Sequence, residues 1–334
     1  MSGKRAAVIW LALAMCALAV LMAALALGSV QVSPWKVFGA LVHAQTEGVT
    51  DSSGEIVRTL RLPRAVAGFA CGGLLALAGA LLQVLLRNPL AEPYVLGVSG
   101  GAAAFAVLAL AAGAVRWVVD TASFAGALLS IALVLGFARR AFWRGEAQEA
   151  SPRLLLTGVV LATGWGAVVM LILTLMPDER LRGVLFWLTG DLNGAGDPWP
   201  ALAALVVALA ASVPVAPQLN VLIRGEAFAL ALGVPAARLR VRIYLVASLA
   251  AAVAVTTAGT IGFVGLVVPH ALRLICGNDQ RMLVPASALA GGTAVMGADL
   301  VARTVVAPAQ LPIGVVTALV GVPVFLWMLM RGRR

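Results

Sequence analysis

Gly259-Thr-Ile-Gly-Phe-Val-Gly-Leu-Val-Val-Pro-His270 lies inside a run without Lys, Arg, Asp or Glu that extends over residues 243–272. As one straight helix this run would be about 45 Å long at roughly 1.5 Å per residue, but the hydrocarbon core of a bilayer is only about 30 Å thick. Glycine and proline permit the chain to turn, so we expect a turn near Gly259–Gly262. The run is therefore predicted to form two membrane spans, one before Gly259 and one after it.

The rest of the chain repeats this apolar pattern. A membrane-spanning helix needs roughly 20 apolar residues, and the other charge-free runs are close to that length or longer. Together with the divided run they predict an all-α, polytopic membrane protein with about ten transmembrane helices. We expect one transmembrane domain over residues 1–334, and surface or re-entrant helices at two shorter apolar pieces, 183–190 and 227–237. The other runs are 6–35, 65–86, 93–115, 121–138, 154–177, 198–223, 282–298 and 304–330.

Composition supports a membrane location. Of 334 residues, 62% are hydrophobic and 11% charged, and the mean hydropathy is +1.01. A soluble enzyme of this length cannot hide so much apolar surface from water, so lipid is expected to surround the chain. The net charge of +10 comes from short basic clusters between apolar runs, which indicates membrane topology rather than nucleic-acid binding.

The charged ends predict the orientation. We interpret the first run as a retained span, because the apolar core of a signal peptide has only about 7–15 residues. Ten spans place both termini on one side. Lys4 and Arg5 precede the first span and Arg331, Arg333 and Arg334 follow the last, so both termini are predicted to be cytoplasmic under the positive-inside rule.

The chain lacks an energy source of its own. Its only lysines, Lys4 and Lys36, do not stand in the Gly-x-x-x-x-Gly-Lys-Ser/Thr frame of a P-loop. Acidic residues are nearly absent from the predicted spans, which argues against a proton-driven carrier. Neither a catalytic motif nor a metal-ligand spacing is present, and the three cysteines have no redox spacing. We therefore expect no catalytic residue, no metal and no tightly bound cofactor, with energy supplied by another subunit.

Three polar segments each allow a structural and a functional interpretation. Arg61 and Arg64, three residues apart, are either interfacial anchors or a docking point for an acidic partner. Residues 87–93 contain two prolines and form either a plain turn or a rigid loop beside a pore. Residues 225–238 predict a short helix that ends at Gly233 and a second that begins near Pro235, lying either on the membrane surface or in a cleft of a cytoplasmic partner.

Four stretches of this chain resemble the FecCD-type permeases, which serve the vitamin B12, haem and ferric-siderophore ABC importers. The resemblance covers nearly the whole chain in the expected order. The stretches are Arg61-Leu-Pro-Arg64, Asn88-Pro-Leu-Ala-Glu-Pro-Tyr-Val-Leu-Gly-Val-Ser-Gly-Gly101, Gly259-Thr-Ile-Gly-Phe-Val-Gly-Leu-Val-Val-Pro-His-Ala-Leu-Arg273 and Leu311-Pro-Ile-Gly-Val-Val-Thr-Ala-Leu-Val-Gly-Val-Pro-Val-Phe325.

This resemblance implies the fold and the assembly. It implies a type II ABC importer permease fold in the bacterial inner membrane, and a homodimer with the transport pathway at the subunit interface. It also implies two copies of a cytoplasmic ATPase that consumes the ATP, and a periplasmic substrate-binding protein.

The resemblance also assigns roles to residues. The B12 permeases tend to carry a hydroxyl at the second gate position, so Pro152 departs from their pattern. The implied roles are docking of the binding protein at Arg61, Arg64 and Arg303; a cytoplasmic gate at Asn88 and Leu90, with a second gate position at Ser151 and Pro152; and coupling to the ATPase by the 225–240 loop, with Glu226, Leu232, Gly233, Val234 and Pro235.

The cargo is predicted from two further arginines. Arg180 and Arg182 resemble part of the short outer helix at the pathway mouth, where they could attract a carboxylate-bearing cargo or serve as an interfacial belt. They favour haem, followed by a ferric siderophore, with cobalamin as the alternative. A secondary carrier or a passive channel is the alternative of another class.

Overall fold

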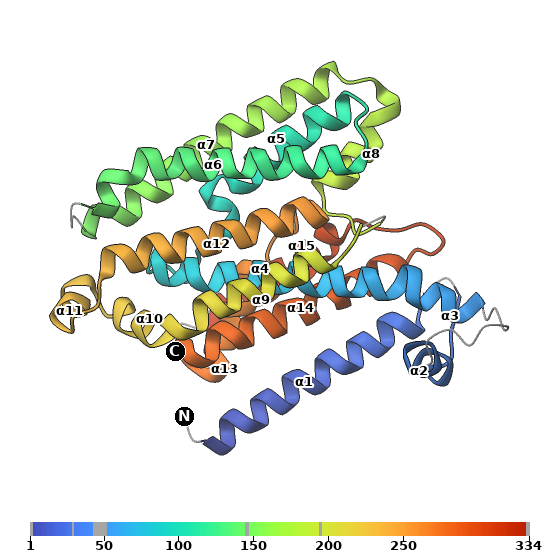
Figure 1. Ribbon diagram of the computed structural model, residues 1–334, viewed down its shortest axis with the longest axis horizontal. Helices are drawn as coiled ribbons and strands as arrows, with labels where there is room; N and C mark the ends of the chain where they lie inside the picture. The colour runs from blue at the N-terminus through green and yellow to red at the C-terminus, as the bar shows by residue number, and fades with distance from the viewer. Residues whose placement is uncertain (1–2, 29, 43–51, 144–146, 194–195, 332–334) are drawn as a thin grey trace.

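The computed structural model describes residues 3–28, 30–42, 52–143, 147–193 and 196–331 (Figure 1), and within these ranges it contains helices and no strand. The helices are α1 (Gly3–Ala26), α2 (Pro34–Val42), α3 (Ser52–Ile56), the π-helical turn η1 (Val57–Arg61), α4 (Leu62–Leu85), the 3-10 turn η2 (Pro93–Leu96), α5 (Val98–Ala111), α6 (Arg116–Trp143), α7 (Ala147–Leu175), α8 (Asp178–Leu188), α9 (Trp199–Ser212), the 3-10 turn η3 (Val213–Val215), α10 (Ala216–Ile223), α11 (Glu226–Ala231), α12 (Ala236–Ala258), α13 (Val264–Cys276), α14 (Gln280–Thr304) and α15 (Ile313–Arg331).

Helix α4 forms the centre of the bundle. It packs against α9, α12, α13 and α14, and 89% of the most apolar part of this span is buried, against 6% in α7. Small residues allow the close approach: a Cβ atom at Gly72 would overlap the carbonyl of Gly291, and one at Gly79 would overlap Gly265. The outer helices instead present their apolar side chains to the surroundings.

The predicted division of residues 243–272 is confirmed. Helix α12 ends at Ala258, Gly259 has a φ of +68°, and α13 begins at Val264. Within the described residues, eight helices are long and apolar enough to cross a membrane, and α5 and α13 are shorter apolar helices at two of the remaining predicted spans. The all-α polytopic fold is thus confirmed, with two of about ten spans shorter than predicted.

Two predicted boundaries are wrong. One helical span runs without a break from Ser53 to Leu85, over 33 residues, so Arg61 and Arg64 lie inside it rather than at its start. Likewise α14 continues to Thr304, which places Arg303 in its last turn instead of before a new span. Charged residues do not end these helices, because each of these arginines finds a partner within the protein.

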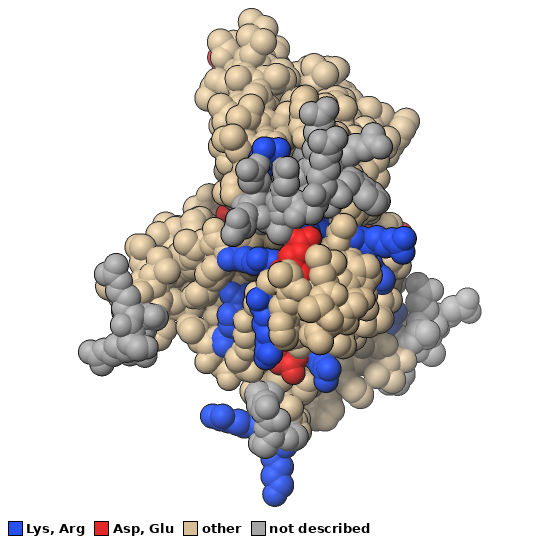
Figure 2. Space-filling view, turned by 90° about the vertical axis from the view of Figure 1, so that its left-hand side faces the viewer, with Lys and Arg blue, Asp and Glu red and all other residues tan. Residues whose placement is uncertain are grey.

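The helices place the two ends of the chain at the same end of the bundle. The start of α1, helix α11 and the end of the chain lie at one end, and α2, α3 and α8 lie at the other (Figure 1). Figure 2 views the end that carries α11, where basic side chains clearly outnumber acidic ones. Helix α1 therefore begins, and α15 ends, at this basic end of the bundle, and the span count predicts that they share one side.

Candidate functional site

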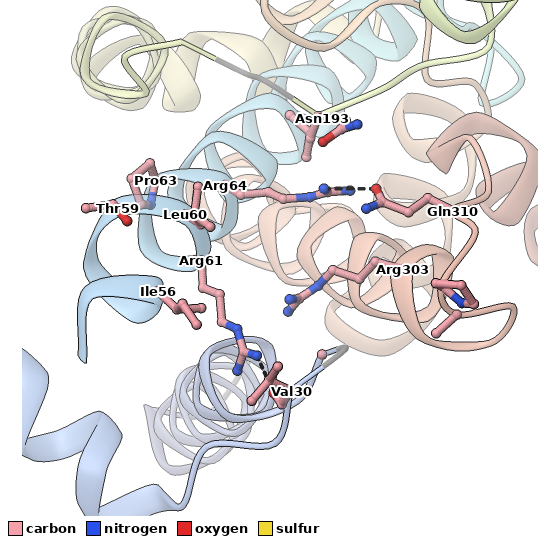
Figure 3. A pocket seen from close by; sticks show the side chains of 14 residues that line it. Val30, Ile56, Thr59, Leu60, Arg61, Pro63, Arg64, Asn193, Arg303 and Gln310 are labelled. Carbon is pink, nitrogen blue, oxygen red and sulfur yellow. Dashed lines mark hydrogen bonds between the residues drawn. The ribbon is translucent and has the colours of Figure 1, made fainter. Parts of the chain in front are cut away.

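Three arginines meet at the end of the bundle opposite α11. Arg61 of η1, Arg64 of α4 and Arg303 of α14 line one cavity of about 360 Å³ (Figure 3). The structure therefore brings together the three residues that the resemblance implies for docking. All three side chains are largely buried, with 6%, 14% and 10% exposure for Arg61, Arg64 and Arg303, so they form no exposed positive patch.

Arg61 binds the C-terminal end of α1. Its side chain is almost fully buried, with the residue only 6% exposed. It donates to the carbonyl oxygens of Leu25 at 2.7 Å, Ala26 at 2.9 Å, and Val30. The last carbonyls of a helix have no partner within it and carry partial negative charge. Arg61 thus caps α1.

Arg303 and Arg64 both lie close to the carboxylate of Asp299. Arg303 donates to the carbonyl of Ala24, also near the end of α1, and its Nε lies 3.7 Å from Asp299. The shorter pair is Arg64–Asp299, with Nη2 2.8 Å from Oδ1, and Arg64 Nη1 donates to Gln310 at 3.1 Å. Asp299 therefore forms its shorter ion pair with Arg64 of α4 and its longer one with Arg303 of its own helix, α14.

The two arginines of α8 are exposed but engaged. Arg180 donates to the carbonyl of Ala111 at the end of α5, a cap of the kind that Arg61 makes. The guanidinium of Arg182 lies over the ring of Phe186, 6.0 Å from its centroid, which is the geometry of a cation–π contact. Each side chain would have to give up its present contact before it could bind a cargo carboxylate.

The predicted gate loop follows α4. Arg87 has a φ of +47°, which ends the helix sharply. The Asn88 side chain accepts a hydrogen bond from the N–H of Leu90 at 2.9 Å, an Asx-type turn, and the side chain of Leu90 is exposed. The Asn88 side chain therefore fixes the backbone at Leu90, whose own side chain faces the outside.

The second predicted gate position lies in the early turns of α7. Pro152 is exposed there, and the side chain of Ser151 lies outside the described residues. Farther along α7, a Cβ atom at Gly158 would overlap Val95 and Leu96, so α7 packs closely against the turn that follows the gate loop. The two predicted gate segments thus belong to neighbouring elements.

The predicted helix–Gly–helix pattern of residues 225–240 is confirmed. Helix α11 ends at Ala231, Gly233 has a φ of +73°, and Pro235 precedes α12. Leu232 is 58% exposed at this end of the bundle, and Val234 is half-buried.

Glu226 faces the protein rather than a partner. It is buried and forms an ion pair with Arg240 of α12. Among the residues predicted for coupling, Glu226 therefore positions α11, whereas Leu232 offers an apolar contact surface.

The sequence interpretation misses the polar contacts of Gln83, Glu92 and Tyr94 with the segment after α12. One signal was available, because Glu92 is the only acidic residue between Glu55 and Asp120. Among the described residues, no cluster of His, Cys, Asp or Glu could hold a metal ion.

Comparison with known proteins gives consistent matches. A model of the FecCD transport family matches residues 15–331. A cobalamin import system permease of Halobacterium salinarum is 42% identical over 300 residues, which cover 89% of this chain and 79% of that protein. A vitamin B12 import system permease of Vibrio vulnificus is 39% identical over 332 residues, which cover 96% of this chain and 95% of that protein.

The fold is also found among solved structures. A metal-chelate type ABC transporter in an inward-facing conformation matches with a TM-score of 0.82 and 28% sequence identity, covering 97% of this chain and 99% of that chain. The likeness in sequence and in fold thus extends over nearly the whole molecule.

Proposed function

The chain belongs to the FecCD transport family, and from this premise we propose that it is the membrane-spanning permease subunit of an importer for cobalamin, vitamin B12. At the coarser level it is an ABC importer permease subunit for a chelate or a vitamin. The single observation that carries the choice of cargo is the name shared by relatives about 40% identical over most of this chain, which are cobalamin or vitamin B12 permeases.

This proposal replaces haem as the favoured cargo. The preference for haem depends on Arg180 and Arg182 as attractors of a carboxylate. Arg180 is bound to the Ala111 carbonyl, and Arg182 contacts Phe186. Both arginines therefore have structural contacts that explain them without an anionic cargo. A ferric siderophore remains the second candidate, because the solved relative is a metal-chelate type transporter.

The proposal includes the partners. One transmembrane domain over residues 1–334 pairs with a second copy, and two ATPase subunits bind at the end that carries α11. A periplasmic binding protein docks at the arginine cavity. The basic side chains around α11 (Figure 2) support a cytoplasmic location of that end in the bacterial inner membrane, and of both termini with it.

The cargo is tested by comparing the uptake of three transport substrates. The permease is reconstituted in proteoliposomes with its cognate ATPase and binding protein, and uptake of labelled cobalamin, haemin and a ferric siderophore is compared at equal concentration. We expect uptake of cobalamin to exceed that of the other two, and an ATPase with a disabled P-loop to abolish it. Uptake of haemin without uptake of cobalamin would restore the haem prediction and reject this proposal.

A further inference from the structure

Two side chains at the end of the predicted gate loop, Glu92 within it and Tyr94 just after it, bind the turn between α12 and α13. The hydroxyl of Tyr94 donates to the carbonyl of Ile261 at 3.1 Å and accepts from the N–H of the same residue at 2.9 Å. A carboxylate oxygen of Glu92 accepts from the N–H of Phe263 at 2.9 Å. Together they pair three backbone groups of one turn.

This turn needs partners from outside. Residues 259–263 lie between two helices, so apart from the N–H of Gly259 and the carbonyl of Phe263 their backbone groups have no regular helical partners. Ile261 is almost fully buried, and Phe263 has a φ of +69°, a left-handed conformation that is costly for a bulky residue. Unpaired backbone groups in apolar surroundings are expensive. Glu92 and Tyr94 therefore hold the turn in this shape.

Gln83 makes a matching connection on the other side of the gate loop. Its side-chain N–H groups donate to the carbonyls of Gly265 at 3.4 Å and Leu266 at 3.3 Å. Pro269 has no N–H, so the Gly265 carbonyl four residues earlier lacks its helical donor. The oxygen of Gln83 accepts from Arg273 at 2.8 Å. Contacts with α13 and with the turn before it thus hold both ends of the gate loop.

The same segment reaches α15. A Cβ atom at Gly321 would lie 2.8 Å from the Cβ of Phe263, so no larger residue fits there without a shift. One turn farther, the rings of His270 and Phe325 meet edge to face with centroids 5.8 Å apart. A movement of α15 would therefore press directly on the turn that Glu92 and Tyr94 hold.

We propose that Gln83, Glu92 and Tyr94 form a latch that makes the predicted gate loop, residues 87–93, move together with α13 and α15. The inference rests on the proposed function, because it assigns positioning residues to the gate of a permease. These residues act through the loop, and the position of Leu90 reports their effect. Loss of the latch uncouples the loop from the helices without removing the gate residues themselves.

The test follows Leu90 in the complete importer. Leu90→Cys is introduced into a permease whose native cysteines, Cys16, Cys71 and Cys276, are replaced by alanine. The complex with ATPase and binding protein is labelled with an impermeant thiol reagent, without nucleotide and with ATP and vanadate. The variants are Glu92→Ala, Tyr94→Phe and the conservative Glu92→Gln. Tyr244→Phe is the matched control, because it removes a buried hydroxyl that binds Ile131, on other elements.

The ratio of the two labelling rates decides the proposal. Loss of one such hydrogen bond shifts an equilibrium about fivefold, so we expect Glu92→Ala and Tyr94→Phe to reduce the ratio by about that factor. Glu92→Gln retains an oxygen acceptor and should restore the wild-type ratio, and Tyr244→Phe should leave it unchanged. If Tyr94→Phe keeps the wild-type ratio, the latch is overturned. If Glu92→Ala does not assemble, the result for Tyr94→Phe decides the proposal by itself.

The labelling needs no cargo, which separates the latch from the proposed function. If the wild-type importer fails to transport cobalamin while the variants lose the labelling ratio, the cargo is wrong and the latch is retained. If ATP and vanadate leave the wild-type labelling rate unchanged, no gate movement accompanies the ATPase and the latch is rejected.

Discussion

At the scale of single residues, three arginines at the α8 end of the bundle cap helices. Arg61 and Arg303 both bind carbonyls near the end of α1, and Arg180 binds one at the end of α5. Of the three arginines that line the cavity, Arg64 has its main partners on side chains, Asp299 and Gln310. The three proposed docking arginines therefore should not respond alike to mutation.

Replacing Arg61 should first destabilise the permease. Arg61→Ala removes the Arg61 donor from the buried carbonyl of Leu25 and leaves the carbonyl of Ala26 with only the N–H of Val32. Because hydrogen bonds to a charged group contribute about 1.5–3 kcal/mol, we expect the free energy of unfolding to fall by about 2 kcal/mol. The measurement is the thermal transition of the purified permease in detergent. Arg182→Ala removes an exposed arginine from the same end and should change it little; an equal loss in both variants would contradict the capping role.

Replacing Arg64 should instead change docking. Arg64→Gln removes a charge from the cavity and leaves the cap of α1 in place. Steering by a cluster of charges depends on ionic strength, so the affinity for the binding protein should fall and its dependence on salt should flatten. Binding to the reconstituted complex is measured across ionic strength. Unchanged affinity with an unchanged salt dependence would leave Arg64 as a structural partner of Asp299 alone.

At the scale of elements, the α11 loop combines a rigid base with an exposed apolar tip. The buried Glu226–Arg240 pair joins α11 to α12, and Gly233 allows the sharp reversal before α12. Leu232 then points away from the bundle. A short rigid element of this kind can transmit movement because it does not bend when a partner presses on it.

Leu232→Asp should release the ATPase without unfolding the permease. The side chain is exposed, so its replacement leaves the core intact, whereas a charge in an apolar contact is costly. We expect loss of copurifying ATPase, or ATP hydrolysis without transport. The matched control is Leu41→Asp, an exposed leucine of α2 at the opposite end of the bundle. Normal assembly and transport by the Leu232 variant would move the coupling contact elsewhere.

The start of α14 gives a pH-dependent prediction. Asp279 accepts hydrogen bonds from the side chain of Asn220 and the N–H of Arg281, and the bond from Asn220 is the main reason why its pKa lies below the ordinary value. Asp279→Ala should cost about 1 kcal/mol of stability at neutral pH, as for other N-caps. Because the folded-state pKa is lowered, this contribution is present above the unfolded pKa and is lost as the pH falls through the folded pKa.

The measurement is the stability difference between wild type and Asp279→Ala at neutral and at strongly acidic pH. The difference should shrink as Asp279 becomes protonated. Asn220→Ala combined with Asp279→Ala should show a non-additive effect, because the two side chains share one hydrogen bond. A difference independent of pH would show that the cap does not act through its charge.

How far sequence predicts the elements depends on whether local physics determines them. The turn at Gly259 follows from a length that the bilayer cannot accommodate, and the α11 loop follows from glycine and proline. The continuation of the helix through Arg61 does not, because its burial depends on carbonyls of α1 more than thirty residues away. The contacts of Glu92 and Tyr94 are likewise set by a turn far along the chain, and the isolated acid Glu92 is their one sign in the local sequence.

At the scale of the whole molecule, the two ends are chemically distinct. The arginine cavity and α8 lie at one end, and α11 and both chain ends lie at the other (Figure 1). The sequence predicts which loops lie at each end, because the charged residues stand in the loops between the apolar spans. The burial of the arginines in the cavity is not predictable in the same way, since a buried arginine and an exposed one have the same letter in a sequence.

The central claim is that this chain moves its cargo only with energy from a partner ATPase. The most direct measurement is accumulation of labelled cobalamin in proteoliposomes that hold the permease, its cognate ATPase and the binding protein. We predict accumulation above the external concentration when ATP reaches the ATPase, and none when the permease alone is given a proton gradient. Accumulation by the permease alone, driven by that gradient, would contradict the account.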